Sequence, residues 1–243
     1  MKRIIFPFLG MFMLVLSSCI KTGDSYQTFQ EVPAIVGLSN TFQPLLITQW
    51  ETFIAPDLQD KIFNEIMEGD LLLIWFTVNY NKQPSAAEHV VVSDLQYIKI
   101  GRGSPYATPG GESMTGDYNT PIEEMYMFNR FNKVGDYLLF VFGHTALIDQ
   151  KFTYEMTYDP DNQNDIKVLY LRAKKVGEGS KTESSFLYPF AFNMSYFFNE
   201  NKGANNMVKI SFKFKGVDSE GNHKDKDYFD PYDGRSIFEF PVE

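Results

Sequence analysis

The chain contains one thiol, and its position limits the chemistry that it can take part in. Cys19 is the only cysteine among 243 residues, which excludes an intrachain disulfide and a cysteine-based metal site. It follows a basic start, a thirteen-residue apolar run from Ile4 to Leu16, and two serines. This order is typical of a secretory signal peptide, and the run is shorter than the roughly 20 residues that span a bilayer. We expect residues 1–18 to be removed.

The residues around this thiol predict a lipid anchor. Leu16-Ser17-Ser18-Cys19 resembles the lipobox of bacterial lipoproteins, in which the cysteine receives a diacylglyceryl group before cleavage. Several acyl chains, each contributing about 0.8 kcal/mol per buried CH₂, form a stable anchor where a single chain is marginal. Ile20 is not an acidic retention signal, so we expect transport to the outer membrane of a Gram-negative cell envelope. The periplasmic face and the cell surface both stay open.

The residues that enzymes use for catalysis form no known motif in this sequence. The three histidines, His89, His144 and His223, are far apart, and each lies at an expected turn or strand edge. Neither His-Glu-x-x-His nor Gly-x-Ser-x-Gly occurs, the motifs of zinc and serine hydrolases. We predict that the protein is not an enzyme and that it uses no cofactor and no metal ion.

Two acidic segments are candidate Ca²⁺-binding sites. The segment 159–165 is rich in Asp and Asn but lacks the glycine and the distal Glu of an EF-hand loop, and the segment 225–234 offers four carboxylates near a tight turn. Asp and Asn also favour turns through hydrogen bonds to their own backbone. We therefore expect turns here, with Ca²⁺ binding as the alternative.

Aromatic residues make up 16% of the chain, and most of them fit alternating strand patterns that fill a core. Tyr196, Phe197 and Phe198 are adjacent at the end of an expected strand. Adjacent strand residues point to opposite faces, so at least one of these rings should be exposed. These three residues are the candidate ligand-binding site.

The charge of the chain restricts its partners. The 22 basic and 31 acidic residues give a net charge of −9, and no basic patch is present of the kind that binds nucleic acid. We expect contact with a membrane through the lipid anchor, a protein or glycan partner, and no nucleic acid.

The element pattern indicates an all-β protein. The first half contains expected strands at 31–37, 42–48, 71–80 and 90–100, with one helix at Asp57–Met67, where apolar residues recur at helical spacing. Glycine and proline gather at 101–120, as in a linker or long loop. Further strands follow at regular spacing at 137–142, 152–158, 166–173, 186–196, 207–216 and 237–242.

Several of these segments are similar to the NigD-like lipoprotein family. Glu68-Gly69-Asp70 with its following apolar strand, and Val92 to Ile98, resemble strands that open and close the family's N-terminal barrel. Asp136 to Phe142, Leu169 to Arg172 and Phe190 to Ser195 resemble strands of its C-terminal part. The resemblance implies an OB-like domain followed by a β-sandwich, and it supplies no catalytic residues. Asp70 departs from the polar or basic residue of the family pattern.

These observations predict a small OB-like barrel followed by an antiparallel Ig-like β-sandwich. The expected division is a signal peptide at 1–18, a tether at 19–30, the barrel at 31–101, a linker or long loop at 102–120, and the sandwich at 121–243. As a function we expect a non-catalytic binding or assembly module of the cell envelope. A glycan-binding accessory of a surface polysaccharide system, or an immunity-type protein against a bacteriocin or toxin, is the alternative.

Overall fold

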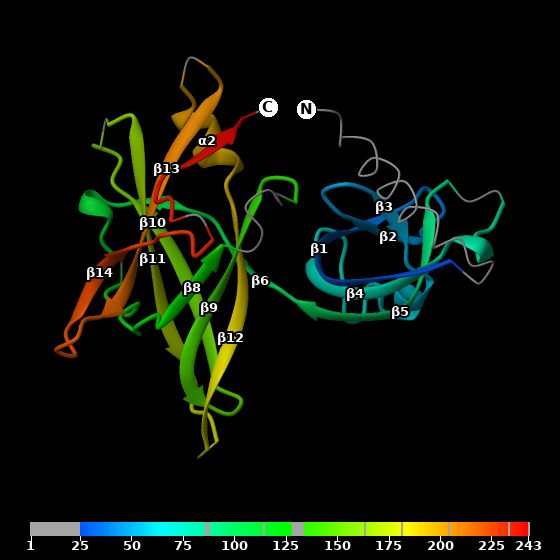
Figure 1. The fold of residues 1–243 in the computed structure, drawn as a ribbon, viewed down its shortest axis with the longest axis horizontal. Helices are drawn as coiled ribbons and strands as arrows, with labels where there is room; N and C mark the ends of the chain where they lie inside the picture. The colour runs from blue at the N-terminus through cyan, green and yellow to red at the C-terminus, as the bar shows by residue number, and fades with distance from the viewer. Residues whose placement is uncertain are drawn as a thin grey trace, which may run out of the picture.

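A computed structural model describes residues 25–85, 88–113, 115–127, 134–162, 164–180, 182–203, 205–232 and 234–242. They form a closed barrel followed by a sandwich of two sheets (Figure 1). The expected all-β fold class is thereby confirmed. Cys19 and the expected signal peptide lie outside the described residues. Among the described residues, no helix is long and apolar enough to cross a membrane.

The barrel contains five strands, closed in the order β1-β2-β3-β5-β4. Their bounds are β1 (Tyr26–Leu38), β2 (Pro44–Ile47), β3 (Thr52–Ile54), β4 (Leu71–Asn79) and β5 (Val90–Lys99). Alternate residues of these strands point inward, where Phe29 stacks on Phe76 at 4.7 Å and Phe53 lies 5.0 Å from Phe76. The strand β1 begins at Tyr26, inside the segment that the sequence assigns to a tether.

The prediction of a helix at Asp57–Met67 is wrong. Only a short 3₁₀ helix, η1 (Pro56–Lys61), forms in this segment. Phe63 then has a positive φ of 69°, and Ile62 pairs with Ile66 in an isolated bridge. Leu58, Ile62 and Ile66 are buried because they cover the barrel core from a compact loop, whereas Met67 is 61% exposed. Their spacing therefore reflects burial rather than a helix.

The sandwich consists of two sheets with the orders β6-β12-β9-β8 and β14-β13-β11-β10-β7, and β15 also pairs with β13. The first sheet contains β6 (Gly101–Gly103), β12 (Glu183–Asn193), β9 (Tyr137–Leu147) and β8 (Glu124–Met127). The second contains β14 (His223–Asp227), β13 (Met207–Val217), β11 (Ile166–Val176), β10 (Lys151–Tyr158), β7 (Tyr106–Ala107) and β15 (Phe238–Pro241). The pairs β6·β12, β7·β10 and β11·β13 are parallel, and the long hairpins are antiparallel.

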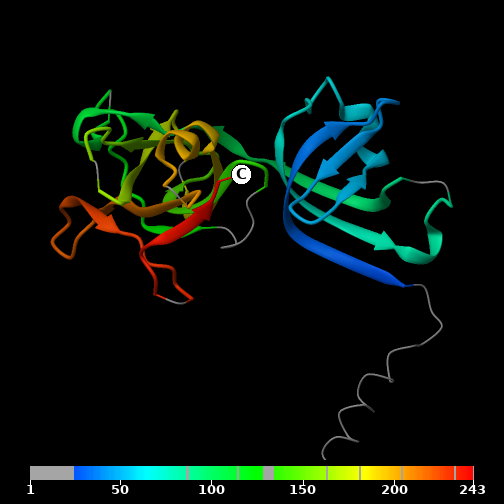
Figure 2. The same ribbon diagram turned by 90° about the horizontal axis from the view of Figure 1, so that it is seen from above.

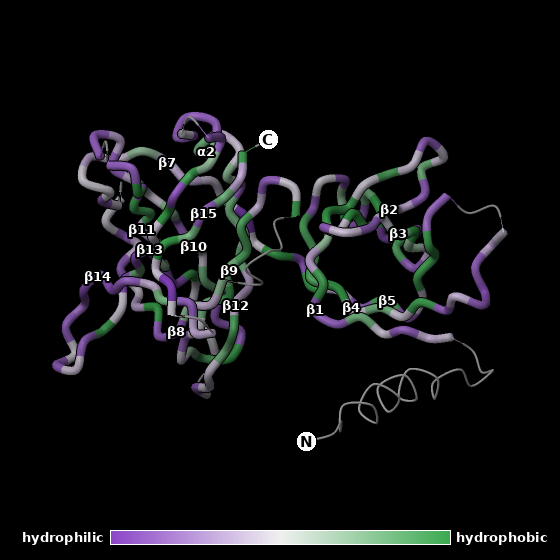
Figure 3. The backbone as a smooth tube through the Cα atoms, turned by 45° about the horizontal axis from the view of Figure 1, so that its top comes forward, coloured by the Kyte–Doolittle hydropathy of each residue, from purple (hydrophilic) through white to green (hydrophobic). Residues whose placement is uncertain are grey.

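An aromatic core joins the two sheets. The ring of Phe140 lies 5.2 Å from that of Phe212 on the facing sheet, and Phe142 stacks on Tyr154 at 4.2 Å. Each of these rings is buried, and rings of this size contribute much of the apolar area that a sandwich core removes from water. Hydrophobic residues follow the strands of both parts, and hydrophilic residues gather in the outer loops (Figure 3).

The glycine-rich segment 101–120 lies against the sandwich. It contributes β6 to one sheet and β7 to the other, followed by the 3₁₀ turn η3 (Pro109–Gly111). The Thr157 hydroxyl donates to the carbonyl oxygen of Gly111 at 2.6 Å and accepts from Arg172 at 2.7 Å. The Tyr106 hydroxyl donates to the buried carboxylate of Glu155. The segment therefore covers polar residues on the outer side of β10 and β11.

The barrel and the sandwich share an apolar contact. Leu71, Leu73 and Ile100 form one buried cluster with Leu139 and Ala191 of the sandwich. Trp75 packs against this cluster, partly buried. Figure 2 shows the two parts side by side, with the chain passing between them. Burial of this area stabilises one arrangement of the two parts.

Candidate functional site

A polar pocket lies at one end of the sandwich, next to α2 (Ser195–Asn201). Its volume is about 390 Å³, within the range of roughly 300–1,000 Å³ that is usual for small-molecule sites. Two parts of the chain that are far apart in the sequence form it. One is the end of β10 with the following turn and the start of β11, and the other is α2 with the residue that follows it. The lining residues are Tyr158, Asp159, Pro160, Asn162, Lys167, Tyr196, Glu200, Asn201 and Lys202.

The structure separates the three adjacent aromatic residues that the sequence singles out. Tyr196 lines the pocket and is 68% exposed, whereas Phe197 and Phe198 are each 1% exposed and belong to the sandwich core. The reason is local. Strand β12 ends at Asn193, whose side chain accepts a hydrogen bond from the Ser195 N–H at 3.0 Å, and the chain continues as a helix. A helix places neighbouring residues about 100° apart, so two rings can face the core together.

Hydrogen bonds within the two segments fix the floor of the pocket. The Lys167 ammonium donates to the carbonyl oxygen of Asn162 at 3.1 Å, and the Asn201 amide donates to the carbonyl oxygen of Phe197 at 2.8 Å. The ring of Tyr158 packs edge-on against Phe197, with centroids 4.9 Å apart. The pocket floor is therefore attached to the sandwich core through Phe197.

The electrostatics of the pocket are balanced. Asp159 and Glu200 supply two carboxylates, and Lys167 and Lys202 supply two ammonium groups. Burial raises the pKa of the Tyr158 hydroxyl, and the nearby Tyr196 and Glu200 raise it further. The hydroxyl of Tyr158 therefore stays protonated at neutral pH and can donate a hydrogen bond.

The acidic segment 159–165 forms a turn, as expected. The Asp159 carboxylate accepts a hydrogen bond from the Asp161 N–H at 3.1 Å, and Asn162 does the same for Asn164. These are the short-range bonds through which Asp and Asn stabilise turns. Within the described part of the chain, no three side chains of His, Cys, Asp or Glu are grouped as a metal site would require.

His144 lies in a different place from the one expected. It is not at a turn but inside β9, where it is 3% exposed. Its ring stacks on Phe152 at 4.1 Å, and its nitrogens lie 3.0 Å from the Pro121 carbonyl oxygen and 3.1 Å from the Tyr154 hydroxyl. Burial lowers the pKa of His144, and the contacts with Pro121 and Glu123 only partly oppose this effect. The residue is thus a neutral, hydrogen-bonded part of the core.

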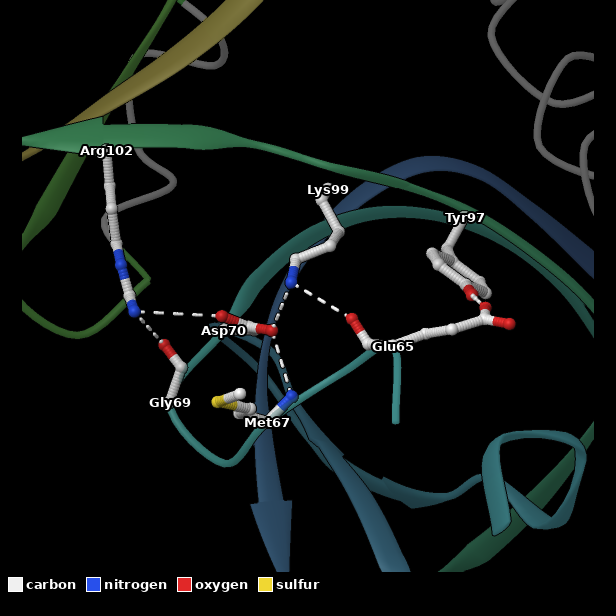
Figure 4. A network of polar contacts seen from close by, with 7 residues as sticks. All are labelled: Glu65, Met67, Gly69, Asp70, Tyr97, Lys99 and Arg102. Atoms are coloured by element: carbon white, nitrogen blue, oxygen red, sulfur yellow. Dashed lines mark hydrogen bonds and ion pairs between the residues drawn. The ribbon is translucent and has the colours of Figure 1, made fainter. Parts of the chain in front are cut away.

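A second polar cluster joins the barrel to the sandwich (Figure 4). Asp70, directly before β4, accepts a hydrogen bond from the Met67 N–H at 2.9 Å and forms an ion pair with Lys99 at 2.7 Å. Arg102 comes from β6 of the sandwich, and it donates to the Gly69 carbonyl oxygen at 2.6 Å. Its guanidinium also lies 3.6 Å from the Asp70 carboxylate. Asp70 therefore provides an acceptor at the junction between the barrel and the sandwich.

The same cluster extends along the barrel. The Lys99 ammonium also donates to the Glu65 carbonyl oxygen at 3.1 Å, and Tyr97 donates to the Glu65 carboxylate at 3.1 Å (Figure 4). Burial raises the pKa of Asp70, but the bonds from Lys99 and Met67 and the charge of Arg102 outweigh it, so the net pKa is lowered. Asp70 is ionised at neutral pH, and Lys99 and Arg102 balance its charge. We assign this cluster a structural role.

The comparisons with known proteins show the fold. No protein-family model and no curated protein matches the chain. An uncharacterised protein from Parabacteroides merdae matches with a TM-score of 0.64 and 19% identity, over 88% of this chain and 100% of its own. A protein from Bacteroides fragilis, provisionally named as a lipoprotein, matches with a TM-score of 0.55 and 13% identity, over 84% and 96%.

A NigD-like immunity protein from Bacteroides caccae is also among the matches. Its TM-score is 0.49 at 12% identity, over 92% of this chain and 100% of its own. At 19% and 13% identity, the matches to the proteins from Parabacteroides merdae and Bacteroides fragilis show that this chain shares their fold.

Proposed function

We propose that the protein is a non-catalytic binding module of the cell envelope, held to a membrane by lipid on Cys19. The observation that carries the binding role is the pocket between the 158–167 segment and α2, which has one exposed ring at its edge and polar groups on its floor. Such a combination of a ring with a few placed polar groups is what small-molecule sites use to orient a ligand.

The absence of catalysis is part of the proposal. His144, a side chain that could act as a general base, is stacked in the core and bonded on both ring nitrogens. His223 is exposed on β14, and no histidine lines the pocket. A general base has to reach the proton that it removes within hydrogen-bond distance, and His144 is not placed to do so from the pocket.

The anchor is supported by the sequence around Cys19. The motif Leu16-Ser17-Ser18-Cys19 places a single thiol directly after the expected cleavage site. We propose the outer membrane as the site of anchoring, since Ile20 carries no charge that would retain the protein elsewhere.

Photo-crosslinking on cells tests the proposed function. A photoreactive amino acid replaces Tyr196 in the full-length, membrane-bound chain, and a second strain carries it in place of the exposed Tyr232, outside the pocket. The proposal predicts an adduct with an envelope component that forms from position 196 and not from position 232. Equal labelling from both positions, or none from position 196, would contradict the binding role.

The anchor is tested in the same strains by fractionation. The Cys19→Ala variant should leave the membrane fraction and lose incorporation of radiolabelled palmitate. A variant that stays in the membrane would show that lipid on Cys19 does not hold the protein there.

A further inference from the structure

We infer that the pocket beside α2 binds a neutral saccharide, with the ring of Tyr196 as its stacking surface. The inference rests on the proposed binding function, and it names the class of ligand. Three properties of the lining support it: the balance of its charges, the pairing of its amide groups, and the position of its exposed ring.

The charges disfavour an ionic ligand. Two carboxylates and two ammonium groups line the pocket, so a ligand with one net charge would be attracted by one pair and repelled by the other. An apolar ligand is disfavoured for a separate reason. It would remove these charged groups and two amides from water without replacing their hydrogen bonds, and each group left unpaired costs its full desolvation penalty.

The amide groups offer one donor and one acceptor. The Asn162 carbonyl oxygen accepts from the Asn164 N–H at 3.1 Å, and its NH₂ group makes no hydrogen bond to another described residue. In Asn201 the donor is used and the acceptor is left. Its NH₂ group donates to the Phe197 carbonyl oxygen at 2.8 Å, and its side-chain carbonyl oxygen accepts from no described residue. A hydroxyl group both donates and accepts, so the hydroxyls of a sugar match both amides.

The exposed ring supplies an apolar surface at the edge of this polar floor. Tyr196 is 68% exposed, and both it and Tyr158 line the pocket. One face of a pyranose ring presents C–H bonds, whose partial positive charge suits the negative face of an aromatic ring. A saccharide can therefore stack on Tyr196 while its hydroxyls reach the floor, whereas glycine, a zwitterion without a side chain, would pair with the charges and leave the ring uncovered.

The test is a titration of the mature chain, carrying Cys19→Ala so that it is purified without lipid, followed by saturation-transfer NMR and calorimetry. The probes are maltose, cellobiose and lactose as neutral saccharides, glucosamine and glucuronic acid as charged ones, and glycine as a zwitterion. Tyr196→Ala removes the stacking surface, Tyr196→Phe keeps it, and Tyr232→Ala removes an exposed ring outside the pocket. Thermal unfolding of each variant checks that the fold is intact.

The inference predicts that a neutral saccharide binds and that Tyr196→Ala weakens binding roughly three- to tenfold. Tyr196→Phe, which keeps the ring, should bind more tightly than Tyr196→Ala, and Tyr232→Ala should leave the affinity unchanged. Binding that Tyr196→Ala does not affect would overturn the site. Binding of charged probes or glycine alone, lost in Tyr196→Ala, would overturn the ligand class and leave the proposed function standing.

Binding of none of the probes would also overturn the inference. The crosslinking experiment then decides the proposed function separately. An adduct specific to position 196 would preserve a binding role for another ligand class, and the absence of one would reject both.

Discussion

Arg102 of the sandwich donates a 2.6 Å hydrogen bond to the carbonyl oxygen of Gly69 in the barrel. The contact is next to the apolar cluster that the two parts share, which includes Leu71 and Ile100. Residues close to each other in the chain thus provide both the polar and the apolar part of the junction. This arrangement stabilises one orientation of the barrel relative to the sandwich.

We predict that Arg102→Ala lowers the free energy of unfolding by about 1 kcal/mol. Hydrogen bonds from charged donors contribute more than this when buried, but the Arg102 side chain is 48% exposed and solvent screens part of the effect. Urea denaturation at neutral pH measures the change. Lys209→Ala, which removes an exposed ion pair with Asp165, is the control and should leave the midpoint unchanged. An equal loss of unfolding free energy in both variants would show that the junction contact stabilises the fold no more than an exposed ion pair does.

Gly111 and Gly110 provide a matched pair that tests how tightly the 101–120 segment packs. Both have a positive φ, 71° and 62°, so alanine costs about 1–2 kcal/mol of backbone strain at either position. A methyl group on Gly111 would also lie within 2.4 Å of the Tyr170 ring, whereas one on Gly110 meets nothing within 4 Å. Gly111→Ala should therefore lower the melting temperature clearly more than Gly110→Ala. Similar melting temperatures would indicate that the segment does not pack on Tyr170.

His144 should make stability depend on pH. Burial lowers the pKa of His144 in the folded chain, whereas in the unfolded chain this pKa is about 6.5. At mildly acidic pH the unfolded chain therefore binds more protons than the folded chain does. The contribution of neutral His144 is complete above that value and is lost as the pH falls through the lower pKa of the folded state. Urea midpoints at about pH 7.5 and about pH 5 measure this loss.

The His144→Gln variant isolates this contribution. It should be less stable than the wild type at neutral pH, and its midpoint should fall less on acidification. His223→Gln changes an exposed histidine and serves as the control. An unchanged pH dependence in His144→Gln would mean that His144 does not titrate differently in the folded and unfolded chains.

The fold class could be predicted because strand patterns are local. Leu71–Asn79 is apolar on both faces, since one face fills the barrel and part of the other meets the sandwich. Alternation along Met207–Val217 likewise separates a buried face from a more exposed one. Such segments indicate strands without any knowledge of their partners.

The candidate site could be predicted only in part, because it depends on tertiary contacts. The sequence indicates Tyr196 as one of three adjacent rings. It does not indicate the helix that turns Phe197 and Phe198 into the core. The available signal was Asn193, whose bond to Ser195 ends the strand. The opposite wall of the pocket comes from Tyr158 and the turn after it, and no local pattern connects these residues with α2.

The most direct test of the binding role is diffraction from crystals of the mature chain grown with the neutral saccharide that titrates most tightly, or with maltose if several are equal. We predict electron density for a sugar ring lying on Tyr196, with hydroxyl groups within hydrogen-bond distance of Asn162 and Asn201. A sugar bound elsewhere on the protein, with this pocket holding only solvent, would contradict it.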